Sequence, residues 1–457
     1  MEGSIQAPVR HPIPWREEDF WDQLSLDDEL RRVFDICHGC RRCFNLCDSF
    51  PQLFDVIDES ESGELDSVSS DTFPKIADSC TLCDMCFLTK CPYVPPHEFN
   101  IDFPHLMLRA RAVEVAKIGK PPFLQNQLAQ MDRNGKIGKY FGFLFNFLTN
   151  LNNKIFRKIL DYFLSIDYRV LLPKFDMRRI KIPLANSDGN AKKRKAVIYT
   201  SCYANFNRTE IAEASLSVLA AQGVQIKVHY PECCGMPMLE QGNIEKVSES
   251  AERIAESFVS FIEQGYDVIA LTSSCALMMK YEWPLILPEN KSIKLLSENA
   301  FDIDEYIVDI SKNEGLVDGM KPVDGGISLH LACHSRAQNM GAKSNELLKL
   351  IPDADISIVE RCSGHGGTFG VLSPTHELAR KVGKPAARQV AKSNPSYVVS
   401  SCPLASKHLS QVTKEDILKD EDNSKKIRSG HPVELMAVSA GYNLVSRFLV
   451  ASGIHAN

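Results

Sequence analysis

Apolar and polar positions follow two different patterns along this chain. Ahead of a polar linker at 184–195, apolar residues recur at helical spacing, which predicts an amphipathic helix over 16–36 and another over 105–117. Behind the linker, short β-type runs alternate with longer helical segments, an order typical of parallel α/β units. The pattern therefore predicts a multidomain fold, in which an α-helical N-terminal domain is followed by α/β domains.

The α/β part is predicted to be a duplication. Three cysteines of its first half recur in its second half at spacings of 131, 129 and 127 residues: Cys202 with Cys333, Cys233 with Cys362, and Cys275 with Cys402. Predicted strands precede the first two cysteines of each copy (196–200 and 225–230; 327–331 and 356–359), and predicted helices lie between the strands (209–222 and 245–264; 344–350 and 375–392). Ligand sites of parallel sheets lie beyond the carboxyl ends of the strands, so the cysteines of each copy are expected at one sheet edge.

An aromatic and basic segment at 139–174 stands apart from both parts. It mixes phenylalanines with lysines and arginines at close spacing. Two interpretations stay open: an interfacial segment that contacts a membrane, a quinone or a partner groove, and a helical hairpin packed on the body of the protein. Charges interrupt the segment too often for a spanning helix, and the sequence has no run of about 18 or more apolar residues.

Eight cysteines near the N-terminus carry the strongest chemical signal. They form two runs with metal-ligand spacing: Cys37, Cys40, Cys43 and Cys47, then Cys80, Cys83, Cys86 and Cys91. Three thiolates spaced by two residues can wrap one iron–sulfur cube, and in two-cluster ferredoxins the fourth thiolate comes from the other run. The spacing therefore predicts two [4Fe-4S] clusters with the following ligands: Cys37, Cys40, Cys43 and Cys91 for cluster 1, and Cys80, Cys83, Cys86 and Cys47 for cluster 2.

Two features depart from the ideal ferredoxin pattern. Asp48 rather than proline follows Cys47, and four residues rather than three separate Cys86 from Cys91. A zinc-bound scaffold is the alternative metal interpretation, although closed zinc sites use paired ligands rather than evenly spaced triplets. An acidic, serine-rich segment at 55–71 lies between the two runs and is either a solvated insertion or a docking site for a basic redox partner.

Composition narrows the class of protein. With 457 residues and 44% hydrophobic content, the chain is long enough for several buried cores. Its formal net charge of −6 lacks the excess of basic residues that is typical of nucleic-acid-binding proteins. Its 15 cysteines cluster in metal-like spacing without a signal-peptide profile before them, so a reducing cytoplasm is expected. No Gly-x-Gly-x-x-Gly element stands in a strand-to-helix setting, so flavin or nicotinamide chemistry is expected on another chain.

The cysteines of the α/β part stand in specific motifs. These are Cys202, Cys233-Cys234-Gly235 and Cys275 in the first copy, and Cys333, Cys362-Ser363-Gly364 and Cys402 in the second. The motifs resemble the paired CCG cysteine-rich domains of heterodisulfide reductase. Joined to a two-cluster N-terminal domain, the layout resembles the D subunit of that enzyme and the C subunit of anaerobic glycerol-3-phosphate dehydrogenase. The resemblance implies an iron–sulfur oxidoreductase subunit that accepts electrons from a partner protein and passes them towards a quinone or a thiol/disulfide site.

Both copies depart from the full family motif, which ends in C-x2-C. Met278 and Ala405 stand where the last cysteine would be, and Ser363 replaces one of the paired cysteines. An additional, unusual iron–sulfur cluster or redox site in the first copy is therefore left open, and the weaker second copy is either functional or a vestigial buried trio. His334 and His365 are candidates for lowering a thiol pKa or moving a proton, or else are ordinary loop residues.

The sequence thus predicts four regions and two functions. The regions are a two-cluster ferredoxin-type domain at 1–120, a helical connector at 121–190, and CCG-like repeats at 191–320 and 321–457, the last with a C-terminal packing helix that reaches Val450. The first functional hypothesis is an electron-transfer subunit with a redox partner protein, and the second is a thiol/disulfide reductase that uses the first repeat. The expected location is the cytoplasm, with peripheral contact to the inner face of the plasma membrane left open. Nucleic acid is not an expected partner, and no catalytic residue is identified.

Overall fold

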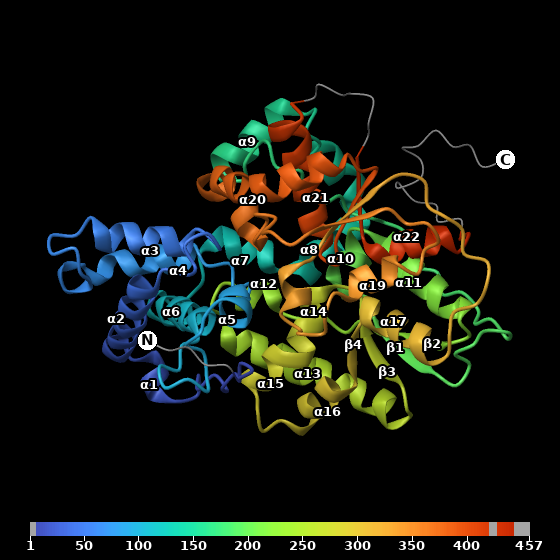
Figure 1. The fold of residues 1–457 in the computed structure, drawn as a ribbon, viewed down its shortest axis with the longest axis horizontal. Helices are drawn as coiled ribbons and strands as arrows, with labels where there is room; N and C mark the ends of the chain where they lie inside the picture. The colour runs from blue at the N-terminus through green and yellow to red at the C-terminus, as the bar shows by residue number, and fades with distance from the viewer. Residues whose placement is uncertain (1–5, 420–426, 443–457) are drawn as a thin grey trace.

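The N-terminal region is helical in the computed structural model, which describes residues 6–419 and 427–442. Its α-helices are α1 (Glu18–Trp21), α2 (Gln23–Cys40), α3 (Ser49–Asp58), α4 (Phe73–Asp78), α5 (Met85–Thr89) and α6 (Phe103–Ile118), at the blue end of Figure 1. Helix α2 begins where the Asp22 side chain accepts a hydrogen bond from the Ser25 backbone, and it ends at Arg41 in the left-handed conformation. The helix predicted at 16–36 is thus divided into α1 and α2, and α2 ends four residues later than expected and carries two cysteines in its last turn.

The segment between the two cysteine runs is short and compact. After α3 it forms two single 3-10 turns, η1 (Leu65–Ser67) and η2 (Ser70–Thr72). Arg31 of α2 holds this segment, since its guanidinium donates to the carbonyl oxygens of Leu65 and Val68 at 3.1 Å each.

Two parallel four-stranded sheets make up the rest of the molecule. The first contains β1 (Lys195–Tyr199), β2 (Gln225–Val228), β3 (Asp267–Ala270) and β4 (Ala300–Asp302) in the order β2-β1-β3-β4. The second contains β5 (Ile327–His330), β6 (Ile356–Val359), β7 (Tyr397–Val399) and β8 (Arg428–Gly430) in the order β6-β5-β7-β8. The identical order confirms the predicted α/β duplication. The fourth strands were not predicted, because three residues are too few for a periodic pattern.

Helices cover both sheets in the same sequence. The first unit has α10 (Ser201–Phe206), α11 (Thr209–Ala221), α12 (Met236–Leu239), α13 (Ile244–Glu263), α14 (Ser273–Leu277), a π-turn η3 (Met278–Glu282), α15 (Trp283–Ile286), α16 (Lys291–Asn299) and α17 (Ile303–Asn313). The second has α18 (Cys333–Arg336), α19 (Lys343–Leu348), the 3-10 turn η4 (Gly367–Gly370), α20 (Ser373–Ser393), α21 (Pro403–Val412), the π-turn η5 (Thr413–Ile417) and α22 (Pro432–Ser439). Helix α22 is buried, as the predicted packing role requires, whereas its predicted continuation to Val450 lies outside the described residues.

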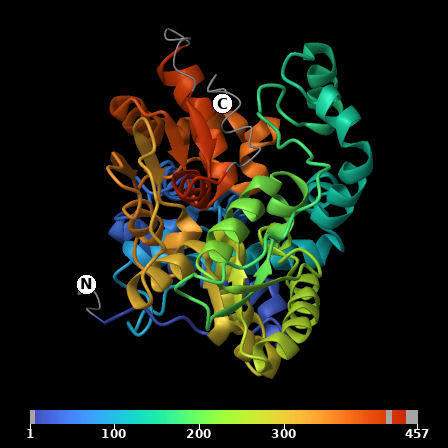
Figure 2. The same ribbon diagram turned by 90° about the vertical axis from the view of Figure 1, so that its right-hand side faces the viewer.

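The connector combines helices with a long extended segment. Its helices are α7 (Phe123–Ala129), α8 (Met131–Leu148) and α9 (Lys154–Leu164), and Figure 2 shows α8 and α9 (teal) along one side of the molecule. Gly135 and Gly138 face the protein, because an added Cβ there would overlap the rings of Phe206 and Phe175. The opposite face of α8 exposes large apolar side chains such as Phe143, which is 64% exposed. No helix of the described residues is long and apolar enough to cross a membrane.

Two hydrophobic cores fix how these parts meet. One core contains side chains of the N-terminal helices, such as Phe34, together with Phe258 of α13. The other joins the two sheets, with Ile198 of β1 and Leu329 of β5 in the same cluster. The first α/β unit therefore packs against both the N-terminal helices and the second α/β unit.

Candidate metal centres

The eight N-terminal cysteines lie in two groups of four. One group lines a small cavity, walled also by Phe50, Phe54 and Ile101, and its members are Cys37, Cys40, Cys43 and Cys91. In the other group, Cys47 is near enough to Cys80 and Cys83 for their charges to act on its pKa, and the same three cysteines act on Cys86. Each group thus holds three cysteines of one run and the last cysteine of the other, which is the arrangement that the spacing predicts.

Burial and mutual repulsion govern the chemistry of these thiols. Burial raises the pKa of Cys37 well above its usual range, and the neighbouring Cys91, Cys43 and Cys40 raise it further. The pKa of Cys43 is raised to about 12 by burial first and then by Cys91 and Cys40. Four such sulfurs can all be thiolates only when positive charge lies among them. Soft thiolate ligands around a hollow therefore fit an iron–sulfur cluster.

The last cysteine of each run, which lies in the group of the other run, accepts hydrogen bonds from backbone N–H groups. The N–H groups of Ser49 and Phe50 donate to Cys47, and this lowers its pKa against the opposing effect of burial. The N–H groups of Tyr93 and Val94 do the same for Cys91. Such N–H···S bonds stabilise thiolates and adjust the potential of a cluster. Within residues 6–419 and 427–442, no three or more His, Cys, Asp or Glu side chains are arranged to hold a single metal ion.

The second cysteine loop is strained and tied down by a buried ionic network. Leu82 and Asp84 adopt positive φ angles of 47° and 62°, which non-glycine residues rarely do. The Arg10 guanidinium forms ion pairs with three carboxylates, with nitrogen–oxygen distances of 2.8 Å to Asp84, 2.7 Å to Asp102 and 3.5 Å to Glu282. Because Glu282 belongs to the first α/β unit, this network fastens the cysteine loop to that unit.

His105 completes the same network. Its ring nitrogens lie 3.2 Å from Asp102 and 3.3 Å from Glu282. Burial and Arg10 lower the pKa of His105, but Asp102 and Glu282 outweigh them and raise it to about 9. The ring is therefore charged near pH 7, and two cations face three carboxylates in the network.

The first copy brings its four cysteines into one chain of sulfur contacts. Cys202 lies in the first turn of α10, three residues after the end of β1, and follows Ser201, which has a positive φ of 61°. The sulfur atoms of Cys202 and Cys233 lie 3.8 Å apart. Cys234 interacts with Cys233 on one side and with Cys275 on the other.

Two further contacts surround this group. The Thr272 hydroxyl donates to the sulfur of Cys275 at 3.1 Å. Met278 is fully buried at the start of η3, where the family motif has its last cysteine. The sequence prediction that these cysteines share one sheet edge agrees with this geometry.

The second copy lies against the second N-terminal cysteine group. Burial raises the pKa of Cys333 well above its usual range, with further contributions from Cys83, Cys362 and Cys402. Burial raises the pKa of Cys83 to about 12, and Cys362 is the next contributor. Two regions that are far apart in the sequence, the 80–86 loop and the second copy, therefore form one thiol-rich region.

The histidines singled out from the sequence lie at this junction. The His334 ring accepts or donates a 2.9 Å hydrogen bond with the Ser274 hydroxyl of the first copy. Burial lowers the pKa of His334, and it lowers the pKa of His365 to about 4. Both rings are therefore neutral near pH 7, so neither supplies a charge that would stabilise a neighbouring thiolate.

Two acidic residues at these sites were missed by sequence reasoning. Asp132 of α8 accepts hydrogen bonds from the backbone N–H of Cys233 at 2.8 Å and from the Tyr230 hydroxyl at 2.6 Å. Burial raises the pKa of Glu240 to about 7, and its charge acts on Cys402 of the second copy. Neither residue stands in a motif, since each reaches its cysteine only through the tertiary fold.

Comparison with known proteins agrees with this architecture. Residues 196–280 and 327–409 each match the model of the CCG family, described as a cysteine-rich domain. The chain is 26% identical over 324 residues to the C subunit of anaerobic glycerol-3-phosphate dehydrogenase from Escherichia coli (strain K12), covering 69% of this chain and 77% of that protein.

Other relatives match over shorter stretches. The B subunit of fumarate reductase (CoM/CoB) from Methanothermobacter marburgensis is 28% identical over 228 residues, 49% of this chain and 43% of that protein. Lactate utilization protein A of Bacillus cereus (strain G9842) is 26% identical over 196 residues, 40% of this chain and 77% of that protein. Each of the two α/β units therefore contains one copy of the CCG cysteine-rich domain, and the chain is similar to subunits of oxidoreductases.

Proposed function

We propose that the chain is an electron-transfer subunit that holds two [4Fe-4S] clusters in its N-terminal domain. The ligands would be Cys37, Cys40, Cys43 and Cys91 for cluster 1, and Cys80, Cys83, Cys86 and Cys47 for cluster 2. The observation that carries the proposal is that Cys91 lines the same cavity as three cysteines of the first run, while Cys47 lies among those of the second. When bound, such clusters supply one-electron chemistry whose potential depends on burial and hydrogen bonding.

The remaining residues of the chain have defined tasks in this proposal. They exclude water from the sulfurs, direct backbone N–H groups at Cys47 and Cys91, and hold the 80–86 loop against the second CCG copy. The proximity of Cys83 to Cys333 and Cys362 supports a route between the N-terminal domain and the CCG domains. A redox partner protein would be the electron donor, and a quinone or a thiol/disulfide site the acceptor.

Metal and sulfide analysis tests this proposal directly. Protein purified without oxygen is expected to contain about eight irons and about eight inorganic sulfides per chain in the N-terminal domain. Reduction should give EPR signals of two interacting [4Fe-4S] clusters. Zinc in place of iron, without sulfide, would refute the redox function and leave the zinc scaffold.

A second candidate function is thiol/disulfide reduction at the first CCG copy. It is favoured by the continuous row of sulfurs that begins with Cys202 and Cys233, 3.8 Å apart. The absence of a cysteine at Met278 counts against a complete family-type site. In the variant Cys234→Ser, loss of disulfide turnover with intact N-terminal EPR signals would support this function, whereas unchanged turnover would refute it.

The connector supports a further part of the proposal, peripheral membrane or quinone contact. Phe141, Phe143 and Phe147 of α8 are 54–69% exposed, and Lys154 and Lys158 lie on the neighbouring α9. Phe145 is less suitable for a test, because its ring packs against Phe175 at 6.0 Å between centroids. Changing the three exposed phenylalanines to serine should move the protein from the membrane fraction to the soluble fraction. An unchanged distribution would show that the hairpin serves packing alone.

A further inference from the structure

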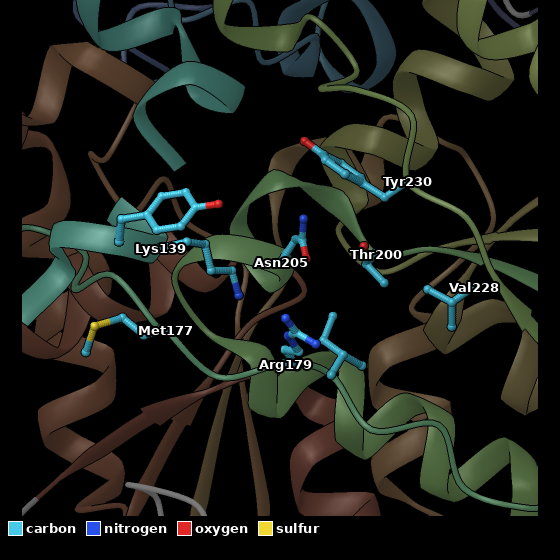
Figure 3. Close-up of a pocket in the computed structure, with 9 residues that line it drawn as sticks. Lys139, Met177, Arg179, Thr200, Asn205, Val228 and Tyr230 are labelled. Atoms are coloured by element: carbon cyan, nitrogen blue, oxygen red, sulfur yellow. The ribbon is translucent and has the colours of Figure 1, made fainter. Parts of the chain in front are cut away.

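A cavity of about 480 Å³ lies between the connector and the first CCG copy (Figure 3). Its size is that of a small-molecule site. Nine residues line it: Lys139, Tyr140, Met177, Arg179, Ile180, Thr200, Asn205, Val228 and Tyr230. The lining combines two cations with aromatic and aliphatic side chains and includes no carboxylate.

The charged side chains of this lining are available to a ligand. The Lys139 ammonium donates one hydrogen bond, to the carbonyl oxygen of Arg178 at 2.7 Å, which leaves two of its three N–H donors. Arg179 is exposed and makes no ion pair or hydrogen bond among the described residues. Figure 3 shows the nitrogen ends of Lys139 and Arg179 turned toward the same space.

One of the residues that line the cavity carries an unsatisfied buried hydroxyl. Thr200 is 1% exposed, and its Oγ1 atom has no hydrogen-bond partner. An unpaired buried hydroxyl costs roughly 1–3 kcal/mol, so such groups normally have a partner. A ligand atom in the cavity would supply this partner.

The cavity shares its walls with the sulfur chain of the first copy. Thr200 and Asn205 lie on either side of Cys202 at the end of β1 and in α10. Tyr230 donates its hydroxyl to Asp132, which also accepts from the backbone of Cys233. Three lining residues of the cavity are therefore close in the sequence, or linked by hydrogen bonds, to Cys202 and Cys233.

We propose that this cavity binds a small carboxylate with an apolar body next to the first CCG copy. The planar guanidinium of Arg179 would receive the carboxylate together with Lys139, because a guanidinium fork matches two carboxylate oxygens. Tyr140, Met177 and Val228 would contact the apolar part. The inference rests on the second candidate function only in that the first CCG copy is the redox site that the ligand would serve.

Binding to the full chain tests the inference without any redox turnover. Benzoate should bind with one site per chain by calorimetry, and neutral benzamide at least about tenfold more weakly, as the loss of one charge-assisted pair implies. Arg179→Gln should weaken benzoate binding at least about tenfold and leave benzamide unchanged. Lys136→Gln removes an exposed cation of α8 that does not line the cavity; it is the control and should bind benzoate as the wild type does.

Three outcomes would overturn the proposal. They are equal affinity for benzoate and benzamide, benzoate binding that Arg179→Gln leaves unchanged, and tighter binding of phenyl phosphate than of benzoate. Undetectable benzoate binding at ~10 mM would also overturn it. If benzoate does not bind but iron content and EPR signals are intact, the carboxylate site is refuted and the electron-transfer function still holds. If a chain without iron binds benzoate, the carboxylate site is supported and the electron-transfer function fails.

Discussion

Replacing Arg10 with methionine is expected to loosen the N-terminal domain from the first CCG domain. Arg10 reaches three carboxylates, Asp84, Asp102 and Glu282, at 2.8, 2.7 and 3.5 Å, and its own side chain is 13% exposed. Without it, the positive charge of His105 alone would face three buried carboxylates. Methionine keeps much of the volume and the contact with the ring of Phe87, over which the guanidinium lies at 4.5 Å. The change therefore isolates the loss of charge.

The magnitude follows from the burial of the group. Removing one partner of a buried ionic group costs about 3–5 kcal/mol, because the remaining charges stay desolvated. The midpoint of urea unfolding at pH 7, measured without oxygen by circular dichroism and by visible cluster absorbance, should fall accordingly. The cluster absorbance should bleach first, since Asp84 lies within the 80–86 loop. Arg16→Met is the control, because Arg16 is exposed and contacts only the ring of Trp15 among the interactions described.

An Arg10→Met protein whose stability lies within about 0.5 kcal/mol of the wild type, as for an ordinary surface substitution, would refute the reasoning. Bleaching that coincides with global unfolding in both proteins would show that the loop does not depend on this network.

Three further predictions follow from the same structure. The pKa of His105 is about 9 in the folded protein and 6.5 when unperturbed, so its charge stabilises the fold by roughly 3 kcal/mol below pH 6.5, and this stabilisation is lost as the pH rises through 9. His105→Gln should therefore flatten the pH dependence of the free energy of unfolding in that range, and an unchanged slope would argue against this role of His105. Gly138→Ala should lower the free energy of unfolding by about 1–3 kcal/mol and displace α8 from Phe175, whereas the control Gly39→Ala should be tolerated, because a Cβ at Gly39 meets nothing within 4 Å. Equal stabilities of the two variants would contradict the packing of α8. Thr200→Val should leave folding intact, since its hydroxyl has no partner to lose, and a marked loss of stability would mean that the hydroxyl is satisfied in the apoprotein.

Much of this architecture could be predicted from local sequence patterns. The regular spacing of Cys37 to Cys43 and of Cys80 to Cys86 indicated two groups of metal-ligand type, and the recurrence of Cys202 at Cys333 indicated the duplication. Strand β1 was predicted to within one residue at each end because its buried run is uninterrupted. These features depend on residues that are close together in the chain or repeated at a fixed interval.

The rest depends on contacts that no local pattern encodes. Arg10 and Glu282 are separated by 272 positions, and the pairing of two charged residues leaves no periodic trace in the sequence. Asp132 lies in a helix that sequence reasoning assigned only to a connector, yet it bonds to Cys233. The glycines of α8 gave no signal of their own, because their function is to let Phe175 and Phe206 approach.

The exchange of Cys47 and Cys91 between the two cysteine groups is the central claim, and EPR of single Cys→Ala variants tests it most directly. Each variant should lose one cluster, about four irons, and keep the signal of the other. The account predicts that Cys91→Ala retains the same signal as Cys37→Ala, and that Cys47→Ala retains the same signal as Cys80→Ala. If Cys91→Ala instead matched Cys80→Ala, and Cys47→Ala matched Cys37→Ala, each run would bind its own cluster and the account would be contradicted.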